Sequence, residues 1–190
     1  MRIVGGSLAG RKLEPPTSRA TRPMMDRVRQ ALFNILEHRD WGKSIGDLFY
    51  ETEVLDAFCG TGALAFEAIS RGAVHATLFD KERQALLIAK KNATALGIEK
   101  KCAIIEGDAL APSKAKKPCK LVFLAPPYRK DLIPPAMLAC DAAGWIAKHA
   151  LIVAETAKKE TLGIPEGFNV LFSRFYGDTA LHFIERRKLT

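Results

Sequence analysis

Cysteine and histidine are scarce in this chain of 190 residues, which contains four of each. The cysteines are widely separated, form no CxxC pair and have no group of histidines nearby, so we expect neither a metal site nor a disulfide. Each is interpreted as a small buried apolar side chain in a reducing compartment. They are Cys59, Cys102, Cys119 and Cys140.

Long apolar runs are also missing. A membrane-spanning helix needs roughly 20 consecutive apolar residues, and no segment approaches that length. The opening residues Met-Arg-Ile-Val-Gly-Gly lack the apolar stretch of a signal peptide. We therefore expect a cytoplasmic protein.

Neither charge nor apolar content is extreme, because 48% of the residues are hydrophobic and 26% are charged, as in ordinary globular proteins. The length suits one domain with a sizeable core and is too short for two of ordinary size. We predict a single domain over residues 1–190, with a basic arm or hairpin at 1–22 and a helix plus α/β core at 23–190. We expect it to be a monomer.

Acidic residues are scarce near the N-terminus, where the first 30 residues hold seven basic side chains and two acidic ones. The net charge of the whole chain is +8, so more than half of the excess lies in this segment. Such a concentration favours a polyanionic partner, and arginines suit forked phosphate contacts. A solvated charged surface is the alternative. The candidate RNA-binding residues are Arg2, Arg11, Lys12, Arg19, Arg22, Arg27 and Arg29.

From residue 53 onward, apolar runs of strand length alternate with helical segments, which predicts a parallel sheet covered on both faces. A helix opened by residues 21–23 and ending near Arg39, followed by a loop at 40–52, should precede it. Two β-rich runs around Gly177-Asp178 predict a terminal antiparallel hairpin and a seven-stranded, mostly parallel sheet. The expected strands are 54–58, 75–79, 102–106, 121–124, 150–154, 168–176 and 180–185, and the later helices are 63–71 and 81–96.

Glycines follow the first of these strands and lead into a helix. Gly60 and Gly62 would let a ligand approach the backbone, and the helix N-terminus offers free N–H groups. Asp80, at the end of the next strand, is placed to accept hydrogen bonds from a ribose. The glycine spacing alone also fits a nicotinamide dinucleotide. Asp56 favours S-adenosylmethionine instead, because a carboxylate opposes a pyrophosphate but attracts the ammonium of an amino acid.

Asp108 follows the third strand, where its side chain could accept a hydrogen bond from an adenine amino group. Phe58 and Ala109 complete the candidate cofactor set. Each aspartate also has a structural interpretation, as a turn or helix cap. All of them lie at the ends of successive strands, the edge at which open α/β sheets bind ligands, which favours the functional interpretation.

Several longer motifs resemble a known family. They are Arg2-Ile3-Val4-Gly5-Gly6, Gly10-Arg11-x-Leu13, Thr21-Arg22-Pro23-x-x-Asp26-Arg27-Val28-Arg29-x-Ala31-Leu32-Phe33-Asn34-Ile35-Leu36, Asp56-x-Phe58-x-Gly60-x-Gly62-Ala63-Leu64 and Tyr176-Gly177-Asp178-Thr179. With them the chain resembles the class I S-adenosylmethionine-dependent methyltransferases, and most closely the bacterial 16S rRNA guanine-N2 methyltransferases often called RsmD. The resemblance implies a Rossmann-like fold, S-adenosylmethionine bound around the aspartates and glycines above, and methylation of a guanine amine in small-subunit rRNA.

The resemblance also implies that Leu124-Ala125-Pro126-Pro127-Tyr128 forms the catalytic lip. Relatives carry Asp or Asn before Pro-Pro-Tyr, where its side chain accepts one amine proton and the first proline carbonyl accepts the other. The prolines fix the direction of that carbonyl, and Tyr128 is expected to stack on the flipped base. Ala125 offers no side-chain acceptor, so water or Asp131 is the expected substitute.

Three functions follow from these patterns. The first is an rRNA methyltransferase that acts on the small subunit or an assembly intermediate. The second is a weakly active or non-catalytic RNA-binding relative, as the alanine at position 125 suggests. The third is a nicotinamide oxidoreductase, which only the glycine spacing favours.

Overall fold

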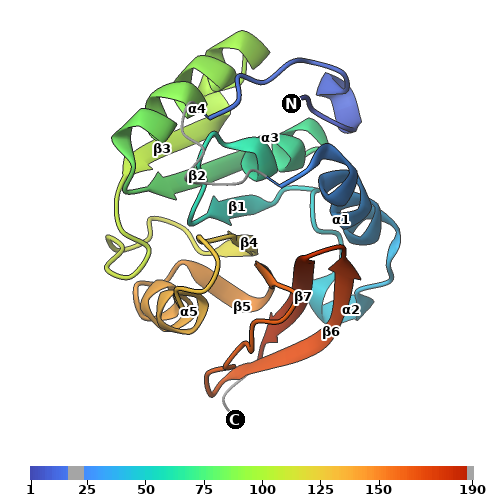
Figure 1. The fold of residues 1–190 in the computed structure, drawn as a ribbon, viewed down its shortest axis with the longest axis vertical. Coiled ribbons are helices and arrows are strands. Elements are labelled where there is room, and N and C mark those ends of the chain that lie inside the picture. Colours follow the sequence, from blue (N-terminus) through green and yellow to red (C-terminus); the bar gives the residue numbers. More distant parts are fainter. Residues whose placement is uncertain (17–23, 188–190) are drawn as a thin grey trace.

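The computed structural model describes residues 1–16 and 24–187 of the chain. Its centre is a seven-stranded sheet in the order β3-β2-β1-β4-β5-β7-β6 (Figure 1). Strands β1 to β5 pair in parallel, and β7 pairs antiparallel with both β5 and β6. The predicted fold class is therefore confirmed. The strands are β1 (Glu53–Asp56), β2 (His75–Asp80), β3 (Cys102–Glu106), β4 (Cys119–Leu124), β5 (Ile146–Ala157), β6 (Phe168–Tyr176) and β7 (Thr179–Arg186).

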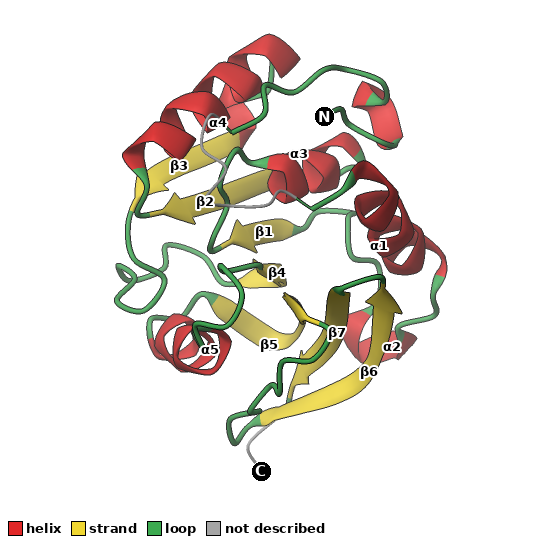
Figure 2. Cartoon of the chain, viewed as in Figure 1, coloured by secondary structure: helices red, strands yellow, loops and turns green. Residues whose placement is uncertain are grey.

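Helices surround the sheet, as Figure 2 shows in red around the yellow strands. Apolar residues of α1, α2, α3 and α4 pack into one buried cluster, and those of α5 pack into a second cluster on the other face. Strand β4 shows why there are two, since Phe123 faces the first cluster and Val122 the second. The helices are α1 (Asp26–His38), α2 (Gly42–Ile45), α3 (Ala63–Ser70), α4 (Arg83–Leu96) and α5 (Ile133–Ala142), with 3-10 turns η1 (Gly6–Leu8) and η2 (Glu99–Lys101).

The N-terminal segment forms the predicted hairpin in its described part, residues 1–16. Arg2 and Lys12 pair as an antiparallel bridge, and the Ile3 N–H donates to the Arg11 carbonyl at 2.9 Å. Ile3 and Leu13 are buried in the same cluster as the helices of the first face. The hairpin has no core of its own and is stabilised by packing on the sheet domain.

Some boundaries differ from the prediction. The described part of α1 begins at Asp26, and residues 21–23 lie outside the described residues. Strand β1 ends at Asp56 rather than at residue 58, because the chain turns there into the glycine loop. Helices α2 and α5 were not predicted. The first has only 4 residues, and the second is apolar around most of its circumference and has two prolines in its first turn, so neither has a clear helical pattern.

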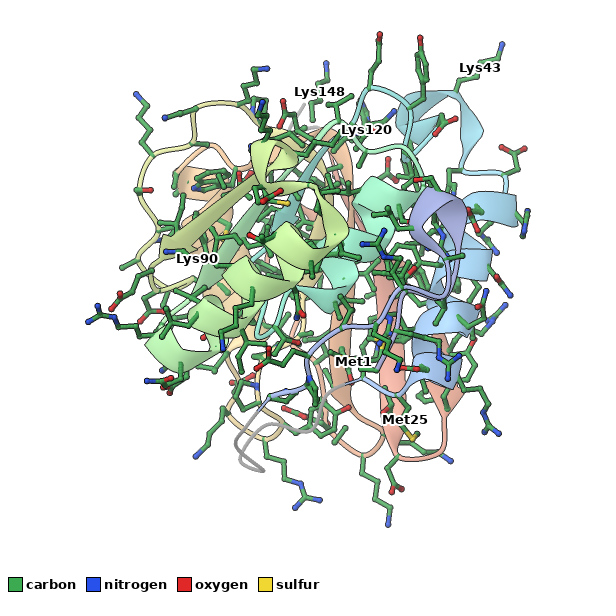
Figure 3. All side chains as sticks on the ribbon, turned by 90° about the horizontal axis from the view of Figure 1, so that it is seen from above. Met1, Met25, Lys43, Lys90, Lys120 and Lys148 are labelled. Atoms are coloured by element: carbon green, nitrogen blue, oxygen red, sulfur yellow. The ribbon has the colours of Figure 1, made fainter. Side chains whose placement is uncertain are left out.

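The start of α1 and the amino ends of the parallel strands lie on opposite sides of the molecule. In Figure 3, Met25 lies at the opposite end from Lys43, Lys120 and Lys148. Lys120 and Lys148 belong to the first halves of β4 and β5. The start of α1 therefore lies toward the carboxyl ends of the parallel strands, where ligands bind in this architecture.

Candidate functional site

The site is set by a reversal in strand order. Strands β2 and β3 extend from one side of β1, while β4 and β5 extend from the other. In an open α/β sheet, the crevice at such a reversal, beyond the carboxyl ends of the strands, is the usual ligand site. Asp56 is the last residue of β1, and Ala125 follows the last residue of β4. The structure thus brings the predicted cofactor loop and the predicted catalytic lip to adjacent strand ends.

Glycine is required at the turn into α3. Gly62, the residue before the helix, has a φ of 86°, in the left-handed region. A Cβ at this position would lie 2.4 Å from ring atoms of Phe66. The loop is closed by a hydrogen bond from the Gly62 N–H to the Cys59 carbonyl at 2.8 Å. Gly60 also has a positive φ of 52°, although the space around it is open. A side chain at position 62 would therefore force the buried Phe66 ring of α3 out of its place.

Asp56 is a buried carboxylate with one oxygen unsatisfied. Its exposed fraction is 1%, and its Oδ2 accepts a hydrogen bond from the Ala65 N–H at 3.3 Å. Within the described residues, Oδ1 has no hydrogen-bond partner. Burial raises the pKa of Asp56 to about 7, and repulsion from Asp80 adds to the shift. An unsatisfied buried acid at the ligand edge suits a cationic group, which would lower its pKa again.

Asp80 braces the same loop. Its Oδ2 accepts from the Gly60 N–H at 2.8 Å, and its Oδ1 accepts from the Glu82 N–H at 2.9 Å. The carboxylate therefore joins the glycine loop to the turn before α4, although it does not cap that helix, whose N-cap residue is Glu82. Each oxygen retains a second lone pair. Asp80 is partly exposed, so a ribose hydroxyl could still reach it.

The third aspartate is the weakest of the candidates. Asp108 is exposed, and its Oδ1 accepts a hydrogen bond from the Leu110 N–H at 2.9 Å, as in a simple turn. Ala109 beside it is buried, with an exposed fraction of 2%, and Phe58 packs against the second apolar cluster. These residues lie after β3 and after β1, so their placement at the ligand edge agrees with the prediction while their contacts remain local.

The predicted catalytic lip, residues 124–128, leaves the sheet immediately after Leu124. Ala125 is half-buried against the first apolar cluster, Pro126 is buried and Pro127 is exposed. The Tyr128 hydroxyl donates to Glu155 Oε1 at 2.5 Å and lies 3.1 Å from Thr179 Oγ1. The lip is therefore attached to β5 and β7 through the end of a tyrosine side chain.

The loop after the lip holds two non-glycine residues in left-handed conformations. Arg129 has a φ of 58° and Asp131 a φ of 49°. The Arg129 N–H donates to Glu160 Oε1 at 3.1 Å, and the Ala157 N–H donates to Glu160 Oε2 at 3.2 Å. One carboxylate thus ties this loop to the end of β5. Asp131, the expected substitute acceptor, is exposed, whereas Glu155 is the buried carboxylate attached to the lip.

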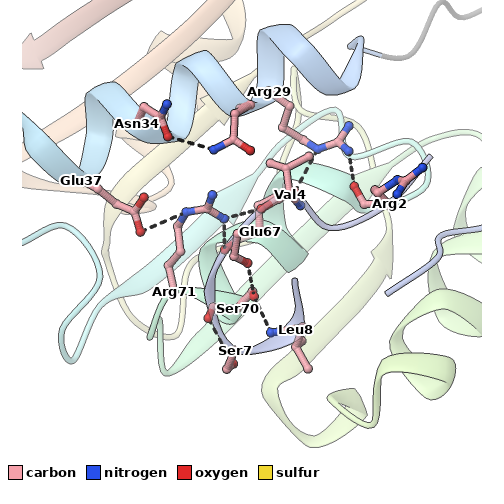
Figure 4. Close-up of polar contacts among 12 residues, drawn as sticks. Arg2, Val4, Ser7, Leu8, Arg29, Asn34, Glu37, Glu67, Ser70 and Arg71 are labelled. Atoms are coloured by element: carbon pink, nitrogen blue, oxygen red, sulfur yellow. Dashed lines mark hydrogen bonds and ion pairs between the residues drawn. The ribbon is translucent and has the colours of Figure 1, made fainter. Parts of the chain in front are cut away.

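The predicted RNA-binding arginines do not all face the solvent. Arg29 is fully buried, so that part of the prediction is wrong. Its Nε contacts Glu67 Oε1 at 3.1 Å and its Nη2 contacts Asp26 Oδ1 at 2.9 Å. Figure 4 shows Arg29 also reaching the Arg2 carbonyl. The reason is helical geometry, because position 29 lies on the buried face of α1.

The other described basic candidates are exposed, as contact with RNA would require. Arg2, Arg11, Lys12 and Arg27 are exposed, although the Arg11 guanidinium donates to the Ala95 carbonyl. Arg19 and Arg22 lie outside the described residues.

Two polar residues that the sequence analysis missed attach the hairpin to the core. Glu67, within α3, accepts from the Val4 N–H at 2.6 Å and also pairs with Arg71 (Figure 4). Asn92 accepts from the Glu14 N–H at 2.7 Å and donates to the Thr61 carbonyl in the glycine loop at 3.2 Å. The sequence did contain a signal for both, because each is a polar residue on the apolar face of its helix and would therefore need a buried hydrogen-bond partner.

A hollow of about 540 Å³ lies away from this site, among residues of α1, α2 and the loop before β1. It adjoins Tyr50 and Gly72, which precede β1 and β2, and so lies at the amino edge of the sheet. None of the described helices is long and apolar enough to cross a membrane. Within the described part of the chain, no group of three or more His, Cys, Asp or Glu is placed to bind a metal ion.

Comparison with known proteins gives a family. The model described as Conserved hypothetical protein 95 matches residues 1–185. Ribosomal RNA small subunit methyltransferase D of Escherichia coli (strain K12) is 32% identical over 188 residues, which cover 98% of this chain and 90% of the relative. The protein of the same name from Haemophilus influenzae is 32% identical over 185 residues, covering 93% and 89%.

A solved structure agrees with the sequence matches. A protein from Escherichia coli, described as a proposed methyltransferase, yhhF, superposes with a TM-score of 0.82 at 30% identity and covers 99% of this chain and 98% of its own. The match extends over the hairpin as well as the sheet. The predicted resemblance is confirmed, and the chain belongs to the RsmD family of class I S-adenosylmethionine-dependent methyltransferases.

Proposed function

We propose that this protein transfers a methyl group from S-adenosylmethionine to the exocyclic N2 amine of a guanine in 16S rRNA of the small ribosomal subunit. The observation that carries the proposal is the placement of the Asp56 loop and the Pro-Pro-Tyr lip at the ends of adjacent strands β1 and β4. The names of the relatives, ribosomal RNA small subunit methyltransferase D, support an rRNA substrate.

The residues at the edge fit the cofactor. The unsatisfied Oδ1 of Asp56 suits its ammonium group, and the lone pairs left on Asp80 suit its ribose hydroxyls. Asp108 and Ala109 would lie at the adenine end. When bound, the cofactor supplies an electrophilic methyl group on a sulfonium. Because Gly60 carries no side chain and the space around it is open, the backbone of the loop stays accessible to a ligand there.

The lip would hold the target amine. The lone pair of a guanine amine is delocalised into the ring, so accepting hydrogen bonds from its protons increases its nucleophilicity. The Pro126 carbonyl is one such acceptor, and its direction is fixed by two consecutive prolines. Ala125 supplies no second one. Alignment of the amine with the methyl group therefore carries most of the catalysis in this proposal, because positioning needs no acid or base.

The test uses small subunits from cells that lack this modification, labelled S-adenosylmethionine and primer extension to map the methylated nucleotide. We expect wild type to label one guanine and Ala125→Asp to be faster. In comparable active sites, removing one well-aimed hydrogen-bonding group lowers kcat on the order of 10²-fold. We therefore expect Ala125→Asp to raise the rate of methylation by no more than about that factor. An Asp variant that is equal to or slower than wild type would show that no acceptor is missing.

A second candidate is an RNA-binding relative that is weakly active or inactive, which the alanine at position 125 favours. It predicts subunit binding without turnover in the same assay. A nicotinamide oxidoreductase has no support from the family or from the buried, unsatisfied acid at Asp56. Calorimetric titration with S-adenosylhomocysteine and with NAD separates that alternative, since only the first should bind.

A further inference from the structure

The C-terminal motif Tyr176-Gly177-Asp178-Thr179 has no role in the function proposed above, yet the structure connects it to the lip. Thr179 is the first residue of β7, and its Oγ1 lies 3.1 Å from the Tyr128 hydroxyl. The carbonyl of Asp178 accepts a hydrogen bond from the Lys158 N–H at 2.7 Å. The hairpin turn is therefore held against the loops that leave β4 and β5.

Glu155 completes this connection from β5. Leu124 pairs with Ala154 in the sheet, and both belong to the second apolar cluster. Side chains alternate along a strand, so the side chains of the next residues, Ala125 and Glu155, lie on the opposite face of the sheet, the face on which Ala125 packs against the first apolar cluster. Glu155 is thus the acidic neighbour of the position that lacks one, and its Oε1 accepts from the Tyr128 hydroxyl at 2.5 Å.

A carboxylate in this place is costly to the fold. The exposed fraction of Glu155 is 7%, and burial raises its pKa, an effect that the bond from Tyr128 opposes. Within residues 1–16 and 24–187 it forms no ion pair. Burying an acid without a cation destabilises a protein, and an apolar residue of similar size would ordinarily be more stable there. The acid is therefore better explained by what it holds than by stability.

We propose that Glu155 and Thr179 are positioning residues that hold the Tyr128 hydroxyl from β5 and β7 and so fix the ring on which the target guanine stacks. The inference rests on the proposed function. The two residues approach the hydroxyl from different strands, and a phenol held by both an acceptor and a hydroxyl has little freedom to swing. Stacking is sensitive to ring orientation, so the tether acts on the alignment of the base.

The experiment measures methylation kinetics on subunits lacking the modification for Tyr128→Phe, Glu155→Leu and the double variant. We expect each single change to lower kcat by about tenfold, the scale of one hydrogen bond to a charged group. Subunit KM should stay near wild type, because phosphate contacts elsewhere dominate binding. The double variant should be no slower than the slower single variant, because both changes remove the same contact.

Three further variants separate positioning from other roles. Glu155→Gln keeps an acceptor oxygen and should stay within about threefold of wild type, and Thr179→Ser should do the same. Glu155→Leu should unfold at the same or a higher temperature than wild type, so its slower turnover would not reflect a damaged fold. Tyr50→Phe, which removes a hydroxyl from a side chain that is 71% exposed at the other end of the sheet, is the control.

Two results would overturn the inference. Losses that multiply to about 100-fold in the double variant would mean that the two side chains act independently. A Gln variant as slow as the Leu variant would mean that the negative charge matters and not the tether. Failure of the proposed function has a different signature, because wild type would then label no guanine at all.

Discussion

The buried pair of Arg29 and Glu67 gives the sharpest prediction for the fold. Both side chains have an exposed fraction of 0%. Arg29 also binds Asp26, the carbonyl of Met24 and the carbonyl of Arg2. Replacing it with Met keeps much of the volume and removes all of these contacts at once.

The expected cost follows from what is left behind. Two carbonyls lose a donor, at about 1 kcal/mol each. In the variant, Glu67 still pairs with Arg71 and still accepts a hydrogen bond from the Val4 N–H, so its buried charge remains partly compensated. Breaking a buried ion pair costs about 3–5 kcal/mol in comparable proteins, and we expect Arg29→Met to fall in that range. That is a large share of a total stability of about 5–15 kcal/mol.

Arg27→Met is the matched control, since Arg27 is exposed on the same helix. Its effect on the free energy of unfolding, measured with urea, should be within about 0.5 kcal/mol. If Arg27 contacts a phosphate, it should reduce the salt dependence of rRNA binding by about one unit of slope. An Arg29→Met protein with wild-type stability and weakened RNA binding would refute the reasoning and return Arg29 to the RNA surface.

Two further predictions concern the cofactor loop. Gly62→Ala should abolish binding of S-adenosylhomocysteine and lower stability, because the added Cβ would lie 2.4 Å from the Phe66 ring on a backbone with positive φ. The control is Gly97→Ala, which introduces backbone strain at a φ of 72° but no clash, because the space around Gly97 is open. Affinity for S-adenosylhomocysteine should increase as pH rises through about 7, because Asp56 must be ionised to attract the ammonium, whereas Asp56→Asn should show no such increase. The free energy of unfolding without ligand should change with pH in the opposite direction, because burial favours protonated Asp56. The stability that protonated Asp56 contributes is fully present below its ordinary pKa of 3.8 and is lost as pH rises through about 7. Calorimetry and urea unfolding across this range check both, and a pH-independent affinity in wild type would contradict the assignment of Asp56.

The central sheet was predictable because its signals are local. Apolar runs of strand length and intervening helices specify a parallel sheet, and the ends of such strands specify where ligands bind. Asp56, Asp80 and the glycines could therefore be assigned to one edge before any coordinates. Helix α5 gave no comparable signal, because it is apolar on most sides and has two prolines in its first turn. Its pattern is that of a buried segment of either kind.

Side-chain partners were less predictable than elements. Arg29 was grouped with exposed arginines on the basis of charge, yet it lies three residues before Leu32 and seven before Leu36, on the apolar face of α1. Reading that spacing would have indicated burial. Glu155 gave only the signal of an acid at the end of an apolar strand. Its partner Tyr128 is 27 positions away, and the register that brings them together depends on the whole sheet.

The same elements serve the hairpin and the cofactor edge. Helix α3 begins at the glycine loop, and Glu67 within it holds the backbone of Val4. Asn92 of α4 bonds the backbone of Glu14 and the carbonyl of Thr61 in that loop. The hairpin is therefore joined to α3, α4 and the glycine loop through the buried side chains of Glu67 and Asn92, in addition to the exposed contact of Arg11 with the Ala95 carbonyl. Since the hairpin carries Arg2, Arg11 and Lys12, these contacts fix where three of the basic side chains lie relative to the glycine loop.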